Sequence, residues 1–438
     1  SKNVSSSSDY VVASRKAGVR GVAGVILGAL VGGGATVGTV QMAYQWGISG
    51  IWFTLGSGIA CLVMGIWFVK PLRSVELITL PQFLGRHYGN KTAMLVAFST
   101  ASGSFLSIIA QFLSGVALIR SVFPVSAEIA AVLVGGLIIA FVFGGGIKSF
   151  SKLGEAKVIF LYLVMVLCVV LVSFNGETPW KLYESLPAEP YFNVLARGAT
   201  KDLGSFASLL LGVLCGQIYI QAVYTASDDQ TAKKGCFWAS LLIPPLGFLC
   251  VWLGLAMRNS GIIVEASQAL PFFIKTSFSP VLGGLLWSGI MITVLGTAVG
   301  VSLGVATNIT RDIVLPMMRN GSKMVDRKVL QLSRITLVFV VASAGTVAYL
   351  SKGSLILQWA YLGMGIKAAG IFIVLLFAVL IPGHLPAKWS ILAVLGGLSG
   401  TAFAGLFLKS VDPLFSGLIF SLIPAMIGFF AGKRNNKR

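Results

Sequence analysis

The sequence predicts an all-α protein that crosses a membrane about 12 times. Its 438 residues are 56% hydrophobic and only 11% charged, a balance far from that of a soluble globular domain. The uncharged stretches are long and continuous, so they lack the alternating polarity of barrel strands. Glycines crowd the middle of two of the apolar segments. We therefore expect a polytopic helical membrane protein in which two helices are broken.

The apolar segments are long enough for a bilayer, since a helix of about 20 residues crosses roughly 30 Å of hydrocarbon. The first lies in a run of 49 residues, 21–69, without a charged side chain. The predicted helices, numbered one to twelve, are 21–46, 48–70, 92–119, 127–147, 155–174, 203–226, 236–257, 281–310, 335–351, 354–382, 389–408 and 412–431.

The two broken helices are expected to be helices one and six. Helix one carries Gly28, Gly32, Gly33, Gly34 and Gly38, and helix six carries the stretch "GVLCGQIYIQ" at the matching place. Broken helices at corresponding positions of two halves are how many secondary transporters build their binding sites. Helices one to five and six to ten therefore read as two inverted repeats.

The chain divides accordingly into five parts. They are a cytoplasmic N-terminal segment (1–20), the first repeat (21–175), an extracellular loop (176–202), the second repeat (203–382), and helices eleven and twelve with a basic tail (383–438).

The distribution of Lys and Arg predicts the orientation. With a cytoplasmic N-terminus, 24 of the 33 basic residues fall in inward segments, 8 fall outside and one, Lys367, lies within a helix. This asymmetry follows the positive-inside rule and places the C-terminus in the cytoplasm. The net charge of +19 is then explained by topology and by contact with lipid headgroups rather than by nucleic acid.

Enzyme chemistry finds little support in the sequence. The 14 Asp and Glu residues all fall in predicted loops or at helix ends, so paired carboxylates within the membrane are missing. The five cysteines are scattered without a CxxC pair, which indicates neither a metal cluster nor a disulfide framework. We expect a protein that is not an enzyme.

Several motifs together resemble a known family. They are "DY" and "SRKAG" before helix one, "GISGIWF" after it, "LRSVELITLPQFLGRHYG" between helices two and three, "GGGIK" ending helix four, "TASDDQTAKKG" after helix six and "ATNITRDI" ending helix eight. The pattern is similar to that of the sodium:solute symporter family. The resemblance implies a LeuT-type fold of five plus five helices with inverted repeats, here followed by two further helices, and transport by alternating access.

The same resemblance implies a sodium site between helices one and eight. Its ligands would be the backbone carbonyls of Gly28 and Val31 together with Thr293, Gly296 and Thr297. Positions 293, 296 and 297 share one helical face. Gly296 stands where the family usually has a hydroxyl, so one side-chain oxygen is missing.

Helix five departs from the family as well. At the start of this helix the family often has an Asp, followed three residues later by a Gln. Glu155 aligns with that Asp only if the alignment is shifted by one residue, and Lys157 lies near the position of the Gln. Two readings stay open for Lys157. Its side chain either extends to the cytoplasmic surface, or its ammonium stands in for the cation.

Lys367 is the most informative polar residue inside a predicted span. It lies near the middle of helix ten, where an unpaired charge costs roughly 3 kcal/mol and no intramembrane carboxylate is available. Two interpretations remain. Either this lysine is neutral or is satisfied by helix carbonyls and water, or it faces the central cavity and binds an anionic substrate or carries a coupling proton. The other candidate substrate residues are Gly33, Gly34, Ala35, Gln111 and Gln217.

The sequence therefore predicts a secondary transporter in the cell membrane. It would import a small organic solute, an anionic carboxylate, by sodium-coupled symport, with sodium as its only cofactor. A proton-coupled or cation-independent carrier of the same fold is the first alternative, and a membrane sensor that binds solute without moving it is the second.

Overall fold

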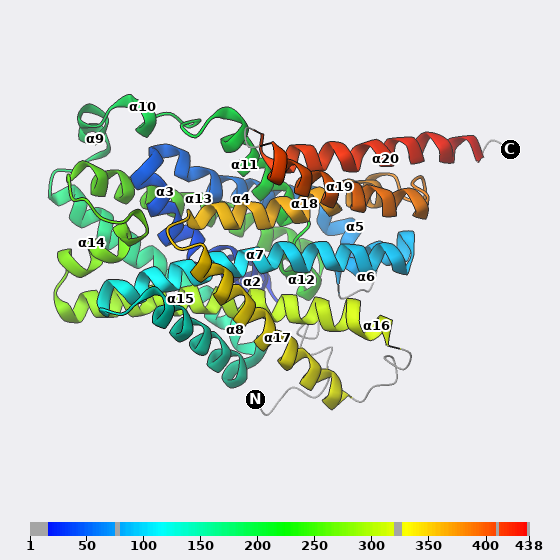
Figure 1. Cartoon of the computed structure of the whole chain (residues 1–438), viewed down its shortest axis with the longest axis horizontal. Helices are drawn as coiled ribbons and strands as arrows, with labels where there is room; N and C mark the ends of the chain where they lie inside the picture. Colours follow the sequence, from blue (N-terminus) through cyan, green and yellow to red (C-terminus); the bar gives the residue numbers. More distant parts are fainter. Residues whose placement is uncertain (1–15, 75–78, 319–325, 409–410, 436–438) are drawn as a thin grey trace.

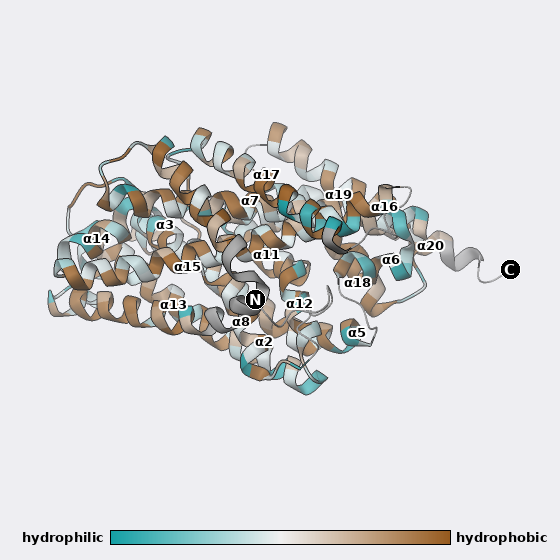
Figure 2. Cartoon of the chain, turned by 90° about the horizontal axis from the view of Figure 1, so that it is seen from below, coloured by the Kyte–Doolittle hydropathy of each residue, from teal (hydrophilic) through white to brown (hydrophobic). Residues whose placement is uncertain are grey.

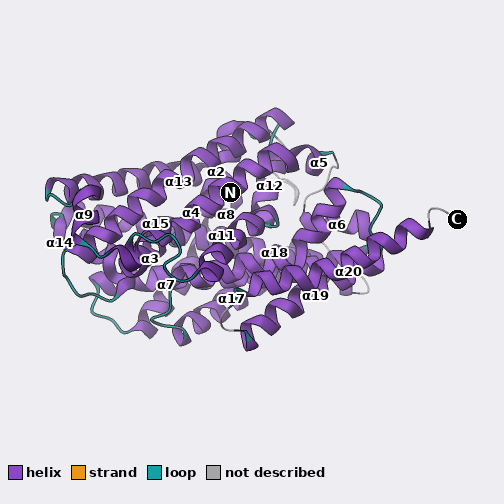
Figure 3. Ribbon diagram, turned by 90° about the horizontal axis from the view of Figure 1, so that it is seen from above, coloured by secondary structure: helices purple, strands orange, loops and turns teal. Residues whose placement is uncertain are grey.

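The structure is a computed structural model, and it describes residues 16–74, 79–318, 326–408 and 411–435. Within helical segments, the side chains of residues 143–153, 155, 326–327 and 432–435 are not described, so the predicted role of Glu155 lies outside the described residues. The described residues form helices joined by turns and loops (Figure 3). The only pairing of strand type among them is an isolated bridge between Ala17 and Ala226.

The first repeat consists of helices that run the length of the molecule and shorter helical segments between them (Figure 1). Its elements are α2 (Val19–Leu30), η2 (Gly34–Gly38), α3 (Thr39–Trp46), η3 (Gly47–Ile51), α4 (Trp52–Val63), η4 (Met64–Phe68), α5 (Val69–Arg73), α6 (Leu80–Tyr88), α7 (Asn90–Val122) and α8 (Ala127–Phe174). Helix one thus consists of α2 and α3, separated by a π turn at η2. The predicted break in helix one is confirmed.

Helices four and five were expected as two helices with a cytoplasmic connection at 148–154. The structure instead assigns one helical run, α8, from Ala127 to Phe174. The connection contains Lys and Ser but no Pro, and the helix continues through its single glycine, Gly154. The apolar portions Ala127–Val142 and Ala156–Phe174 still match the two predicted spans.

The loop that is predicted to be extracellular and the second repeat follow. Their elements are α9 (Pro179–Ser185), α10 (Ala188–Tyr191), α11 (Ala199–Leu214), α12 (Gln217–Thr225), α13 (Asp229–Asn259), η5 (Ala266–Gln268), α14 (Ala269–Ser277), α15 (Pro280–Thr307), η6 (Asn308–Val314), α16 (Leu315–Met317), α17 (Asp326–Leu350) and α18 (Ile356–Leu380). Helix six is broken as predicted, because α11 and α12 meet at an angle of 42°. The final pair is α19 (Ala387–Phe407) and α20 (Pro413–Asn435), which lie side by side (Figure 1).

The protein is a multi-pass membrane protein. Nine helices in the described part of the chain are long and apolar enough to cross a bilayer, or ten if α11 and α12 form one span. This is fewer than 12 because Gly34–Arg73, which joins the second half of helix one to helix two, counts as one segment of 40 residues. The apolar segments Val19–Leu30 and Ala127–Val142 are too short to be counted as spans. Hydrophobic residues predominate along most of the helices, while α5 and α6 carry more hydrophilic residues (Figure 2). Large apolar side chains such as Ile159 and Phe339 are exposed, as expected where lipid replaces water.

The ends of α5 and α12 are joined on the predicted cytoplasmic side. The Arg73 guanidinium donates hydrogen bonds to the carbonyls of Val223 and Ala226, each at 2.9 Å, and pairs with Asp229 at 2.8 Å. Ala17, just before α2, donates its N–H to the Thr225 carbonyl, and its own carbonyl accepts from Ser227 N–H. Free carbonyls at the end of α12 are thereby satisfied, and the ends of helices one and six on this side are held together.

The N-terminus of α13 begins at the next residues of this loop. Asp228 caps the helix by accepting from Thr231 N–H at 2.8 Å. The hydrogen bonds from the Thr231 backbone and hydroxyl lower the pKa of Asp228 to about 2, so the capping carboxylate is ionised at neutral pH. The first turn of α13 is therefore stabilised by a charged cap.

Loss of the Arg73 contacts is expected to open the cytoplasmic side. In Arg73→Ala all three contacts are lost, whereas Asp229→Asn leaves both carbonyl bonds, so the first change should have the larger effect. A reporter cysteine at Gly304, where an added Cβ meets nothing within 4 Å, would face the central cavity. We expect faster maleimide labelling of Gly304→Cys in the Arg73→Ala background. Equal labelling rates in both backgrounds would contradict a gating role for Arg73.

Candidate substrate cavity and cation position

The broken part of helix one is held by a side chain from α7. The α2 helix ends at Leu30, and Val31 adopts an extended conformation with φ −90° and ψ 92°. The free N–H of Gly33 donates to Gln111 Oε1 at 3.0 Å. A Cβ at Gly33 would lie 2.4 Å from Ser114 Oγ, so only glycine allows the backbone this close to α7.

The break in helix six is held from the first residue of α6. Cys215 and Gly216 separate α11 from α12, and Gln217 is the first residue of α12. The Gln217 Oε1 accepts a hydrogen bond from Leu80 N–H at 2.8 Å. Leu80 belongs to the "TLPQFLGRHYG" motif, which thus has a structural role in positioning the second half of helix six.

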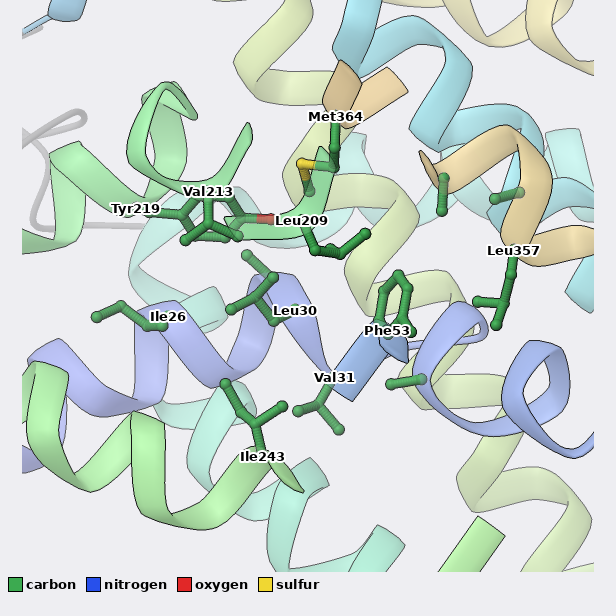
Figure 4. Close-up of a cluster of buried hydrophobic side chains, with 14 of the residues drawn as sticks. Ile26, Leu30, Val31, Phe53, Leu209, Val213, Tyr219, Ile243, Leu357 and Met364 are labelled. Atoms are coloured by element: carbon green, nitrogen blue, oxygen red, sulfur yellow. The ribbon is translucent and has the colours of Figure 1, made fainter. Parts of the chain in front are cut away.

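A central cavity lies between the two breaks, α7, α15 and α18. Its volume is about 50 Å³ in this conformation. Its lining residues Leu30, Phe53, Tyr219 and Met364 belong to a cluster of buried side chains from α2, α4, α12 and α18 (Figure 4). The polar side chains that line it are those of Ser104, Ser107, Gln111, Gln217, Tyr219, Thr297, Asn308 and Lys367. A mostly apolar cavity with a few converging polar groups is typical of a small-molecule site.

Lys367 is the only charged residue of this lining. Its side chain is 3% exposed. Among the described residues, the structure gives its ammonium neither a hydrogen bond nor an ion pair. The α7 and α18 helices approach closely beside it, since a Cβ at Gly103 would lie 2.3 Å from the Gly363 carbonyl and 2.6 Å from Lys367 Cγ. The lysine stem is therefore held against α7 with its charge at the cavity.

The remaining candidate substrate residues fall into two groups. Gln111 and Gln217 line the cavity with Lys367. Gly33, Gly34 and Ala35 do not line it. Gly33 packs on α7 and Gly34 faces Phe53 and Leu357, while the Ala35 carbonyl accepts from the Cys250 thiol at 3.4 Å.

Asn308 is a cavity residue that sequence reasoning did not select. It begins the π segment η6 at the end of α15 and is 1% exposed. Its Oδ1 has no hydrogen-bond partner among the described residues. Asn308 is part of the "ATNITRDI" motif, so the sequence did mark this segment. The sequence did not reveal the π turn at which Asn308 lies beside the cavity.

A pair of aromatic rings lies between the central cavity and a second one. Phe53 lines the central cavity and its ring lies 6.1 Å from that of Tyr361. Tyr361 lines a second cavity of about 480 Å³, together with Arg197 from the loop before α11 and Lys201 from the start of α11. The Arg197 guanidinium stacks over the Tyr361 ring at 5.5 Å. The ring pair thus lies where the two cavities approach each other.

The predicted sodium ligands converge on one point between α2 and α15. Thr297 Oγ1 lies 3.3 Å from the Gly28 carbonyl, 3.5 Å from that of Val31 and 3.1 Å from that of Thr293. Gly296 is buried in the same helix. Four of the five predicted residues thus direct an oxygen toward a common centre.

A lysine ammonium already contacts these oxygens. Lys157 Nζ donates to the Gly28 carbonyl and to Thr297 Oγ1, the latter at 2.7 Å. The side chain is 4% exposed, so it does not extend to the cytoplasmic surface. Two like charges 4 Å apart repel by about 4 kcal/mol at an effective dielectric constant near 20. With Lys157 in this place, these residues do not fit a sodium ion.

The position of Lys157 follows from a close helix crossing. Gly154 lies three residues earlier on α8, and a Cβ there would be 2.3 Å from the Gly24 carbonyl and 3.4 Å from Gly28 Cα. The crossing brings α8 onto α2 and directs Lys157 between α2 and α15. In the sequence, this arrangement was indicated only by a glycine at 154 followed by a lysine three residues later.

Comparisons with known proteins agree with this architecture. Residues 10–384 match the sequence model of the sodium:solute symporter family. The chain is 23% identical to the high-affinity proline transporter PutP of Bacillus subtilis, over 96% of this chain and 92% of that protein. It is 22% identical to the human high affinity choline transporter 1, over 74% of this chain and 58% of that protein.

A solved structure shares the fold over nearly the whole chain. The substrate-bound, outward-open Na⁺-coupled sialic acid symporter superposes with a TM-score of 0.82, covering 99% of this chain and 93% of that chain. The sequence identity is 12%, so this likeness concerns the arrangement of the helices.

Proposed function

Since this chain belongs to the sodium:solute symporter family, we propose that it imports a small organic carboxylate by alternating access. Its fold is of the LeuT type, with broken helices one and six around a central cavity. Proteins of this family and fold are membrane transporters for small solutes. The central cavity supports a carboxylate as the solute.

The observation that carries the proposal is the buried ammonium of Lys367. It lines the cavity and, among the described residues, it has no carboxylate partner there. An uncompensated charge in a membrane costs roughly 2.5–3.5 kcal/mol or more. A substrate carboxylate would supply the missing charge and form a charge-assisted hydrogen bond. The Asn308 and Gln111 amides offer polar contacts to the same small solute.

Two of the similar proteins transport solutes that carry a carboxylate, namely proline and sialic acid. A third transports choline, which is a cation. The family resemblance by itself therefore does not select a charge for the substrate. The volume of about 50 Å³ in this conformation favours a solute of few atoms.

Paired acids and amides provide the test. The purified protein in proteoliposomes would be assayed by solute counterflow, which requires no ion gradient, with propionate against propionamide and lactate against lactamide. We expect the acids to exchange and to raise the melting temperature, and the amides to do neither. If an amide is bound and exchanged as well as its acid, the carboxylate assignment is wrong.

A further inference from the structure

The cation position between α2 and α15 is held by the protein itself. Lys157 Nζ donates to the Gly28 carbonyl and to Thr297 Oγ1, two of the oxygens predicted to bind sodium. An ammonium carries one positive charge and three N–H donors, so it can satisfy several oxygens at once. It therefore supplies both the charge and the contacts that a bound monovalent cation would supply.

The surroundings of Lys157 are built for this arrangement. The side chain is buried, and α8 reaches α2 closely only because Gly154 has no side chain. Gly32 also leaves room for Thr297, since a Cβ there would lie 2.4 Å from Thr297 Oγ1. Thr297, having accepted from Lys157, is 3.1 Å from the Thr293 carbonyl, to which its hydroxyl can donate.

The position also joins three helices. Through Lys157, α8 is bonded to α2 at its last turn before the break and to the middle of α15. A bound sodium ion at this place would connect α2 with α15 in the same way. The lysine thus performs the bridging function without an exchangeable ion.

We propose that the Lys157 ammonium is a built-in cation that replaces sodium at this site, so that solute binding does not require sodium there. The inference builds on the proposed transport of a solute, but sodium binding can be measured without any solute. The missing hydroxyl at Gly296 is consistent with it, because an ammonium with donors to Gly28 and Thr297 does not need that oxygen.

The test is equilibrium binding of ²²Na⁺ to the purified full chain in detergent. Wild type should bind sodium at least tenfold more weakly than Lys157→Ala, in which the oxygens of Gly28 and Thr297 are released. Adding Thr297→Ala to Lys157→Ala should remove the gained binding. Lys234→Ala, which removes an exposed lysine of α13, is the matched control and should behave as wild type.

A second readout does not use the isotope. Replacing N-methyl-D-glucamine chloride by sodium chloride at equal ionic strength should raise the melting temperature of Lys157→Ala and leave that of wild type unchanged. If Lys157→Ala does not fold, Lys157→Gln keeps a polar side chain of similar length and releases the same oxygens. Folding of each variant is checked by a single symmetric peak in size exclusion.

Two results would overturn the inference. One is saturable ²²Na⁺ binding by wild type that Thr297→Ala abolishes, because the ion would then share the site with Lys157. The other is a folded Lys157→Ala and a folded Lys157→Gln that bind no more sodium than wild type. Neither result depends on the solute. A failure of the carboxylate assay would therefore not affect the sodium-binding test, and a failure of the sodium-binding test would not affect the carboxylate assay.

Discussion

Lys367→Met is expected to abolish carboxylate transport without lowering the melting temperature. Methionine nearly matches the length of the lysine stem and packs against Gly103, but it removes the charge at the cavity. A hydrogen bond to a charged group contributes about 1.5–3 kcal/mol, which corresponds to roughly 10- to 100-fold weaker binding. Removing an unpaired charge from the membrane interior should stabilise the fold. Counterflow and thermal unfolding measure the two effects separately.

Two further variants sharpen this prediction. Lys367→Arg keeps the charge but places a larger, planar group in a cavity of about 50 Å³, so part of the transport should remain. Lys388→Met removes an exposed lysine of α19 and should transport as wild type. Normal transport by Lys367→Met would show that this lysine serves helix packing rather than the substrate.

Gly154→Ala is expected to destabilise the protein and to impair transport. The added Cβ would lie 2.3 Å from the Gly24 carbonyl, a backbone atom that cannot rotate away. Overpacking of this kind costs about 1–3 kcal/mol, and it moves α8 away from α2. Lys157 would then lose its contact with the Gly28 carbonyl. Thermal unfolding and counterflow should both report the loss.

Gly136→Ala is the matched control on the same helix. A Cβ at Gly136 meets nothing within 4 Å, and alanine is favoured over glycine within a helix by about 0.5–1 kcal/mol. The control should therefore be at least as stable as wild type. Equal melting temperatures for the two variants would mean that α8 does not depend on close contact with α2 at Gly154.

The parts of the fold predicted from sequence are those that depend on local composition. Glycines at 32–34 and 216 predicted the breaks in helices one and six, because backbone without side chains can leave the helix where other groups satisfy it. The continuity of α8 was not predicted. The polar segment between its two apolar portions has the composition of a loop, yet it contains no residue that must end a helix.

The candidate site was also predicted only in part. The convergence of Gly28, Val31, Thr293 and Thr297 followed from motif alignment. The orientation of single side chains did not follow, because it depends on how far apart the helices lie. Gly33 faces Ser114 rather than the cavity, and Lys157 points inward rather than to the surface, for reasons that only the crossings of α2 with α7 and α8 reveal.

The two backbone hydrogen bonds of Ala17 have a mechanical consequence. They fasten the start of α2 to the end of α12. The α2 helix ends at the break near Val31, and the α12 helix begins at the break at Gly216. Displacing one half-helix without the other would break both of these bonds. We therefore expect the two half-helices to move together when the passage on this side opens.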